Sequence, residues 1–179
     1  DNICHEHLTY FADEPFQRLL DRHGLVVVNT SYNNTNGRSV RYIVKHGKRT
    51  KQGSIEVRHD LRDFKARIED NKERTLKLLY SLRDSGKTVM GIAASTKGNT
   101  LLQYYGIDDT MVVAIADRNK AKVGLRTVGT HIPIISEKEL YERKPDYLFA
   151  LAWHFIDGFR KRYADLEAEW IVPRPELGG

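Results

Sequence analysis

The sequence predicts an α/β fold with a parallel sheet, and two observations lead to that prediction. From residue 88 to residue 172, short apolar runs alternate with segments of helical periodicity. Such alternation is typical of parallel strands joined by right-handed helical crossovers, so this part is predicted to be a Rossmann-like domain. Earlier in the chain, two β-branched runs at 25–29 and 39–44 flank a segment rich in Asn and Gly, which indicates an antiparallel hairpin.

The N-terminal elements are predicted from turn and cap residues. Asp13 suits the N-cap of a helix over 13–23, and Gly24 ends that helix before the hairpin begins. The basic, Gly-containing stretch 45–53 shows no periodicity and predicts a loop or linker. A nucleic-acid interface is the weaker interpretation of that stretch, because no aromatic residues alternate with its charges.

A long amphipathic helix is predicted over 61–85, because its apolar residues share one face and Gly86 follows. We therefore predict three parts: residues 1–53, a connecting helix in 54–86, and the Rossmann-like domain in 87–179. Within that domain, strands are predicted at 88–94, 111–116, 132–135, 147–152 and 170–172, with helices at 99–105, 136–141 and 155–168.

Composition narrows the classes of function. The chain has 179 residues and a net charge of +5, which favours an anionic partner. Its single cysteine, Cys4, excludes an internal disulfide framework and a thiolate-only zinc site. No apolar run reaches the roughly 18–20 residues of a membrane span, so we expect a cytoplasmic protein. Because the chain starts at Asp1 and not at Met, we expect it to be a piece of a longer protein.

The stretch 91–100 runs from a strand through small residues into a helix. A helix N-terminus beside a lysine attracts anions, so Ser95, Lys97, Gly98 and Asn99 are predicted to contact a phosphate-bearing ligand. The glycine and lysine spacing matches neither the dinucleotide fingerprint nor the P-loop. A turn whose small residues allow close packing is an equally good interpretation.

Two further loops follow predicted strands. Asp117 ends the second strand, where an acid often takes ribose hydroxyls, although a turn-forming role is equally good. The stretch 129–134 contains His131 and a proline, and we expect it to line the same crevice as the other two loops.

The chain opens with Cys4-His5-Glu6-His7. A histidine beside a carboxylate suits a general base near neutral pH, so Glu6 and His7 are candidate catalytic residues. A metal site is disfavoured, because two histidines and one thiol within four residues rarely reach tetrahedral geometry, and no metal is predicted. Two surface histidines in a loop are the third interpretation. Trp153 and His154 are predicted to serve packing and a helix start.

Taken together, the segments 1–11, 91–102, 117–124, 129–134 and 145–153 resemble, in order, the C-terminal portion of the sugar C-methyltransferases. These enzymes use S-adenosylmethionine to methylate a ring carbon of nucleotide-linked keto-deoxysugars. Their plan comprises a zinc-binding segment, a class I methyltransferase domain, and a C-terminal Rossmann-like domain that helps to hold the sugar nucleotide. The resemblance implies that the helix at 13–23 and the hairpin at 25–44 close the methyltransferase domain.

The family's catalytic Glu-His pair falls on Glu6 and His7, and Cys4 stands where members often carry tyrosine. The resemblance implies that His7 removes the proton next to the ketone, with Glu6 orienting it, and that the enolate takes the methyl group of S-adenosylmethionine. The cofactor site is expected to lie largely outside this chain. The resemblance implies a nucleotide-diphosphate sugar as the partner, and we expect binding to neither nucleic acid nor a membrane. A homodimer is left open. The alternative is a non-catalytic Rossmann-like module that binds the nucleotide sugar.

Overall fold

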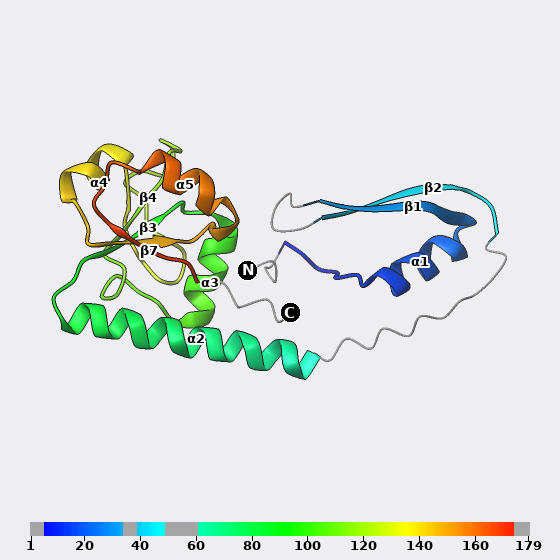
Figure 1. Cartoon of the computed structure of the whole chain (residues 1–179), viewed down its shortest axis with the longest axis horizontal. Helices are drawn as coiled ribbons and strands as arrows, with labels where there is room; N and C mark the ends of the chain where they lie inside the picture. The colour runs from blue at the N-terminus through cyan, green and yellow to red at the C-terminus, as the bar shows by residue number, and fades with distance from the viewer. Residues whose placement is uncertain (1–5, 34–38, 49–60, 174–179) are drawn as a thin grey trace. The chain divides into compact units, whose positions relative to one another are not determined.

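The computed structural model describes residues 6–33, 39–48 and 61–173. They form two compact units, one within His7–Asp60 and the other made of Glu6 and the residues from Leu61 onward, and each is drawn in Figure 1. The interpretations of Cys4 and His5, most of the predicted linker, and the predicted boundary at residue 53 lie outside the described residues. In the part of the chain that is described, no helix has the length and apolar character that crossing a membrane requires.

The N-terminal unit is the predicted helix and antiparallel hairpin. Helix α1 (Asp13–Arg22) precedes β1 (Leu25–Asn33), which pairs antiparallel with β2 (Ser39–His46). Strand β1 is longer than predicted, because backbone pairing continues past a bulge after Val27 through polar, exposed residues. Asp13 is also not the N-cap, because Ala12 occupies that position and provides no side-chain cap.

Aromatic contacts and one carboxylate connect α1 to the hairpin. The ring of Phe16 lies 5.1 Å from that of Tyr42 and 5.3 Å from that of Phe11. The hydroxyls of Tyr32 and Tyr42 both donate to the carboxylate of Asp13. Burial and the Asp13 hydrogen bond raise the pKa of Tyr42 to about 12. None of the described residues of this unit is buried, so these side-chain contacts and the backbone pairing of the hairpin take the place of a core.

The second unit is a five-stranded parallel sheet, which confirms the predicted parallel sheet, and its strands lie in the order β5-β4-β3-β6-β7. Strand β3 is buried along its whole length, which is typical of parallel strands covered on both faces. The strands are β3 (Val89–Ile92), β4 (Ala114–Ala116), β5 (Ile134–Ile135), β6 (Tyr147–Ala150) and β7 (Glu169–Ile171).

Helices cover both faces of this sheet (Figure 1). Helices α2 (Leu61–Asp84) and α3 (Thr96–Tyr105) pack on the face that includes Val89 and Phe149. Helices α4 (Glu137–Arg143) and α5 (Ile156–Arg162) pack on the opposite face. Successive side chains of β3 point to opposite faces of the sheet, so this one strand contributes to two separate apolar layers.

Several predicted boundaries shift. Helix α2 and the capping of α4 by Ser136 are confirmed. The second predicted strand is shorter than expected, since β4 covers only Ala114–Ala116. The last predicted helix is also shorter, because α5 ends at Arg162 and is preceded by the 3-10 turn η2 (Trp153–Phe155). The chain then turns so that Trp170 stacks on Phe159 at the start of β7.

Candidate functional site

The carboxyl edge of the parallel sheet holds most of the predicted site residues. Strand β3 lies between β4 and β6, and the chain crosses over it to continue the sheet on the other side. The order of strands therefore reverses between β3 and β6. In open α/β sheets, ligands bind outside the carboxyl ends of the strands at such a switch point. The loops that follow β3, β4 and β6 meet at this edge.

The loop after β3 leads directly into α3. Ser95 is the N-cap, and its hydroxyl accepts the N–H of Gly98 at 3.1 Å. This bond satisfies one of the four N–H groups that a helix start leaves without an intrahelical partner. Helix α3 therefore begins at Thr96, three residues earlier than predicted.

Glycine at position 98 allows α3 to approach the end of β6. A Cβ atom at Gly98 would lie 2.8 Å from Cβ of Leu151, closer than two carbon atoms can pack. This contact supports the interpretation that small residues allow close packing. It also brings the start of α3 beside η2, and so the packing and phosphate-binding interpretations are compatible.

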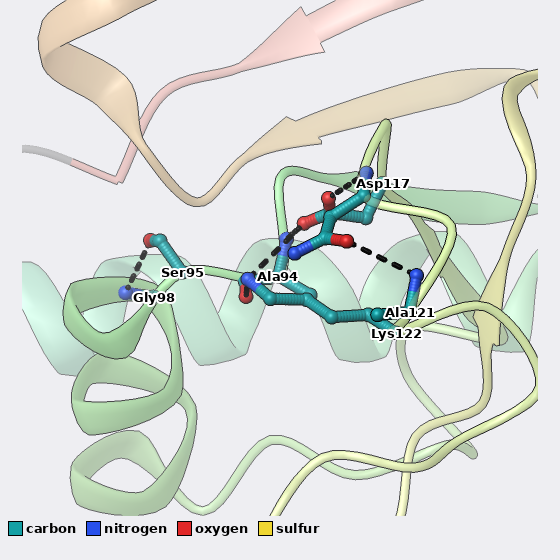
Figure 2. A network of polar contacts seen from close by, with 7 residues as sticks. Ala94, Ser95, Gly98, Asp117, Ala121 and Lys122 are labelled. Atoms are coloured by element: carbon teal, nitrogen blue, oxygen red, sulfur yellow. Dashed lines mark hydrogen bonds and ion pairs between the residues drawn. The ribbon is translucent and has the colours of Figure 1, made fainter.

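Asp117 connects the loops after β3 and β4 (Figure 2). Its carboxylate accepts the N–H of Ala94 at 2.8 Å and the N–H of Asn119 at 2.8 Å. Lys122 Nζ lies 3.7 Å from the same carboxylate and donates to the Ala94 carbonyl at 2.8 Å. A carboxylate offers about four lone-pair sites, so these bonds leave room for a ribose hydroxyl. The structure favours the turn-forming role, and the ribose contact stays a prediction.

Two buried polar atoms at this edge have no hydrogen-bond partner among the described residues: Asn99 Oδ1 and His154 Nδ1. Burial, followed by the charge of Lys97, lowers the pKa of His154, so its imidazole is held neutral. Buried polar atoms almost always find a partner, in the protein, in water or in a ligand. The start of α3 and η2 thus present a cation, an acceptor and an imidazole nitrogen together.

From the sequence, His154 was predicted only to lie at the start of a helix. A signal was available, since His154 lies four residues after Ala150, the last residue of β6, and the carboxyl ends of parallel strands meet at one edge. Asn99 and Lys97, by contrast, were predicted from the sequence. The structure brings Ser95, Lys97, Gly98, Asn99 and Asp117 to this edge.

His131 lies elsewhere. Helix α3 begins at the carboxyl edge and ends at Tyr105, and its Gln103 side chain donates to the Val128 carbonyl at 3.0 Å. The end of α3 lies at the amino edge of the sheet, so its contact with Val128 places that loop at the same edge. His131 lies three residues after Val128 and three residues before β5 begins at Ile134, so it is also at the amino edge. The expectation that its loop lines the shared crevice is therefore wrong. The loop instead closes on itself, since Arg126 Nη1 donates to the His131 carbonyl at 2.6 Å.

Glu6 and His7 are both exposed. The imidazole of His7 lies edge-on to the ring of Tyr10, with 6.4 Å between the ring centroids. An exposed histidine beside a glutamate is chemically able to take a proton from a substrate held next to it. Their catalytic role stays a prediction.

Comparison with known proteins connects both units to one family. Residues 25–175 match the family described as the C-methyltransferase C-terminal domain. The chain is also similar to the C-methyltransferase NovU of Streptomyces niveus, with 31% identity over 195 aligned positions that cover 98% of the chain. The alignment covers 46% of NovU, so the chain spans a little under half the length of this relative.

Proposed function

Since the chain belongs to the family of C-methyltransferase C-terminal domains, we propose that it is part of an S-adenosylmethionine-dependent enzyme that methylates a carbon of a nucleotide-linked keto-deoxysugar. The match to the family along nearly the whole chain carries this proposal. Within it, the unit from Leu61 onward holds the nucleotide diphosphate of the substrate. The segment that contains Glu6 and His7 supplies the base.

The diphosphate is placed at the start of α3. The positive end of the helix dipole and the ammonium of Lys97 both attract phosphate oxygens. Asn99 Oδ1, an acceptor without a partner among the described residues, suits a hydroxyl of the ligand and not a phosphate oxygen, and His154 Nδ1 provides a second polar contact. Asp117 offers its remaining lone pairs to a ribose hydroxyl. His131, at the opposite edge of the sheet, is the predicted contact that this arrangement supports least.

His7 acts as the general base. The ketone acidifies the proton on the neighbouring ring carbon, and the neutral imidazole removes it, leaving an enolate whose carbon is nucleophilic. Glu6 orients the imidazole and stabilises its charge after the proton has moved. Holding the base at contact distance from the proton removes most of the entropic cost of this step.

S-adenosylmethionine supplies the methyl group when it is bound to the complete enzyme. The turn after β3 does not fit it well, because Gly98, its only glycine, is occupied by packing against Leu151. The glycine-rich fingerprint uses separate glycines for the tight turn, for the approach of the phosphate and for helix packing, and this turn has only the glycine that packs. We therefore place the cofactor site largely outside this chain, and no step above depends on its geometry here.

The base can be tested without methyl transfer. In the longer protein that carries this chain, incubation of the keto-sugar nucleotide in D₂O should exchange the proton next to the ketone. His7→Ala should slow this exchange by roughly 100-fold or more, the usual contribution of a general base. Unchanged affinity for the sugar nucleotide would show that only the proton transfer is lost, whereas exchange at the original rate would remove His7 from the mechanism.

The second candidate is a nucleotide-sugar-binding module without chemistry of its own. The share of NovU that the chain covers favours it for the isolated chain. Titration calorimetry of the chain with nucleoside diphosphates, with Lys97→Ala as the variant, tests the binding that both candidates share. If no nucleotide binds to the intact chain, both candidate functions are rejected. If a nucleotide does bind, proton exchange in the longer protein decides between the two candidates.

A further inference from the structure

A cavity of about 320 Å³ lies beside Asp117, between the carboxyl ends of β3 and β4 and helix α5. Ile92 and Ala116 form its wall on the sheet side, and both belong to the apolar layer that faces α4 and α5. Phe155 and Phe159 form the wall on the helix side. The cavity therefore adjoins the proposed phosphate site but is built mainly from other residues.

The aromatic wall is available to a ligand. The side chain of Phe155 is 52% exposed although it lines a cavity. The aromatic rings paired with it are neighbours along its own segment, with centroids 4.3 Å away for His154 and 6.4 Å away for Phe159. An exposed phenylalanine that borders a cavity presents a flat apolar surface on which a planar group can stack.

Two guanidinium groups complete the lining. Arg162 bonds weakly to Glu137 at 3.4 Å, and Arg118 has no ion pair or hydrogen bond of its side chain among the described residues. Guanidinium planes stack on aromatic rings and donate to ring carbonyl and nitrogen acceptors. The lining thus combines apolar walls with donors, a combination that suits a polar heterocycle better than an aliphatic chain.

The size and position of the cavity limit what it can hold. Ligand cavities commonly measure about 300–1,000 Å³, so this one is large enough for a nucleoside but small for a complete sugar nucleotide. The Asp117 carboxylate lies on its border and the start of α3 lies next to it. A nucleotide whose diphosphate sits at α3 would therefore direct its ribose past Asp117 and its base into the cavity.

We propose that this cavity is the base-binding site of the nucleotide substrate, with the base stacked on Phe155 and its polar edge facing Arg118. The proposal rests on the proposed function, because it takes the diphosphate at α3 as its anchor. It goes further in assigning base recognition to Phe155 of η2 and to Arg118 in the loop after β4. It also makes this unit the part of the enzyme that selects the nucleotide.

The test compares nucleotides with a probe that lacks a base. The chain is titrated calorimetrically with UDP, thymidine diphosphate, ADP, GDP and inorganic pyrophosphate. We expect the best nucleoside diphosphate to bind at least about tenfold more tightly than pyrophosphate, because base–aromatic stacking is worth about that factor or more. Phe155→Ala should remove most of this tenfold advantage and leave pyrophosphate binding unchanged.

Two further variants guard against indirect effects. Gly158 lines the cavity, and a Cβ atom added there meets nothing within 4 Å, so Gly158→Leu should fill the cavity and abolish the same advantage. Phe64→Ala removes an exposed phenylalanine of α2 outside the cavity and should change nothing.

The outcomes separate this proposal from the proposed function. A nucleotide advantage that survives both Phe155→Ala and Gly158→Leu would overturn the base site while leaving the phosphate site intact. An intact chain that binds nucleotides no better than pyrophosphate would also overturn it. If neither nucleotides nor pyrophosphate bind, the proposed function fails at its phosphate site and this proposal fails with it.

Discussion

The two units contain similar strands with opposite burial. Strand β1 begins with Leu25 and the three valines 26–28, yet its residues are half-buried or exposed. Strand β3 is no more β-branched, yet all four of its residues are buried. The difference comes from the layers. Helices cover both faces of the five-stranded sheet, whereas α1 is the only helix among the described residues of the hairpin's own unit. Apolar content alone does not make a core.

This contrast predicts very different costs for removing apolar side chains. Phe149 is fully buried in β6, so Phe149→Ala should lower the free energy of unfolding by about 3–5 kcal/mol. Ile43 on β2 is 53% exposed, and Ile43→Ala should change stability by no more than about 0.5 kcal/mol. Urea unfolding measures both. The two tryptophans, Trp153 and Trp170, lie in the α/β unit and report on it alone. Equal losses would show that the hairpin has a core after all.

Glycine substitutions test how closely the layers approach. Gly98→Ala would place Cβ 2.8 Å from Cβ of Leu151, so it should cost about 1–3 kcal/mol through displacement of α3. Gly158→Ala is the matched control, because its Cβ meets nothing within 4 Å. It should raise stability by up to about 1 kcal/mol, since alanine favours a helix over glycine. The two changes in unfolding free energy should therefore have opposite signs, and a stabilising Gly98→Ala would contradict the packing described.

The N-terminal helix caps also differ between the two units, and the α/β unit again has the stabilising feature. Ser95 caps α3 with its hydroxyl, whereas Ala12 precedes α1 with extended backbone and no side-chain cap. Ser95→Ala should cost about 1 kcal/mol, and Ala12→Ser should slow amide hydrogen exchange in the first turn of α1 by adding the missing acceptor. Exchange rates measured by NMR report on each helix separately. If Ala12→Ser leaves exchange unchanged, fraying of α1 has another cause.

Alkaline pH should affect the hairpin unit through Tyr42. Its folded pKa of about 12 lies above the ordinary value of 10.0, so the protonated phenol is favoured by folding. This contribution is fully present below pH 10 and is lost as pH rises from about 10 to 12. Tyr42→Phe should remove that part of the pH dependence, measured as hydrogen exchange of the hairpin or as the difference in tyrosinate absorbance. Asp13→Asn should move the pKa of Tyr42 back towards 10.0, and an unmoved titration would disprove the role of Asp13.

Element types were largely predictable, and boundaries less so. Alternation and caps identified the strands of the sheet, the long helix and the Ser136 cap, because these signals are local. The start of α3 was placed three residues late, since Thr96 and Lys97 carry no apolar periodicity and the helix is initiated by the Ser95 cap. The end of α5 was placed too late, because helical pattern continues beyond Arg162 while the chain must turn to seat Trp170 beside Phe159.

The residues of the candidate site were also predictable where local sequence placed them and not where the fold did. Residues adjacent in sequence, such as Ser95 and Lys97, were found together because one turn carries them. His131 was grouped with them through sequence pattern alone, but the direction of β5 relative to β4 places it at the opposite edge. His154 was predicted only as a helix start, because its place near α3 depends on the pairing of β6 with β3.

By itself, the sequence determined which segments form strands and helices, the family to which the chain belongs, and the polar residues that begin α3. The tertiary structure alone decided the strand order, the cavity beside Asp117, and the meeting of Asn99, Lys97 and His154 at one edge. The physical reason is that periodicity records only which face of each element avoids water. Which elements then become neighbours depends on crossovers and on close approaches such as that of Gly98 to Leu151, and these involve residues far apart in the chain.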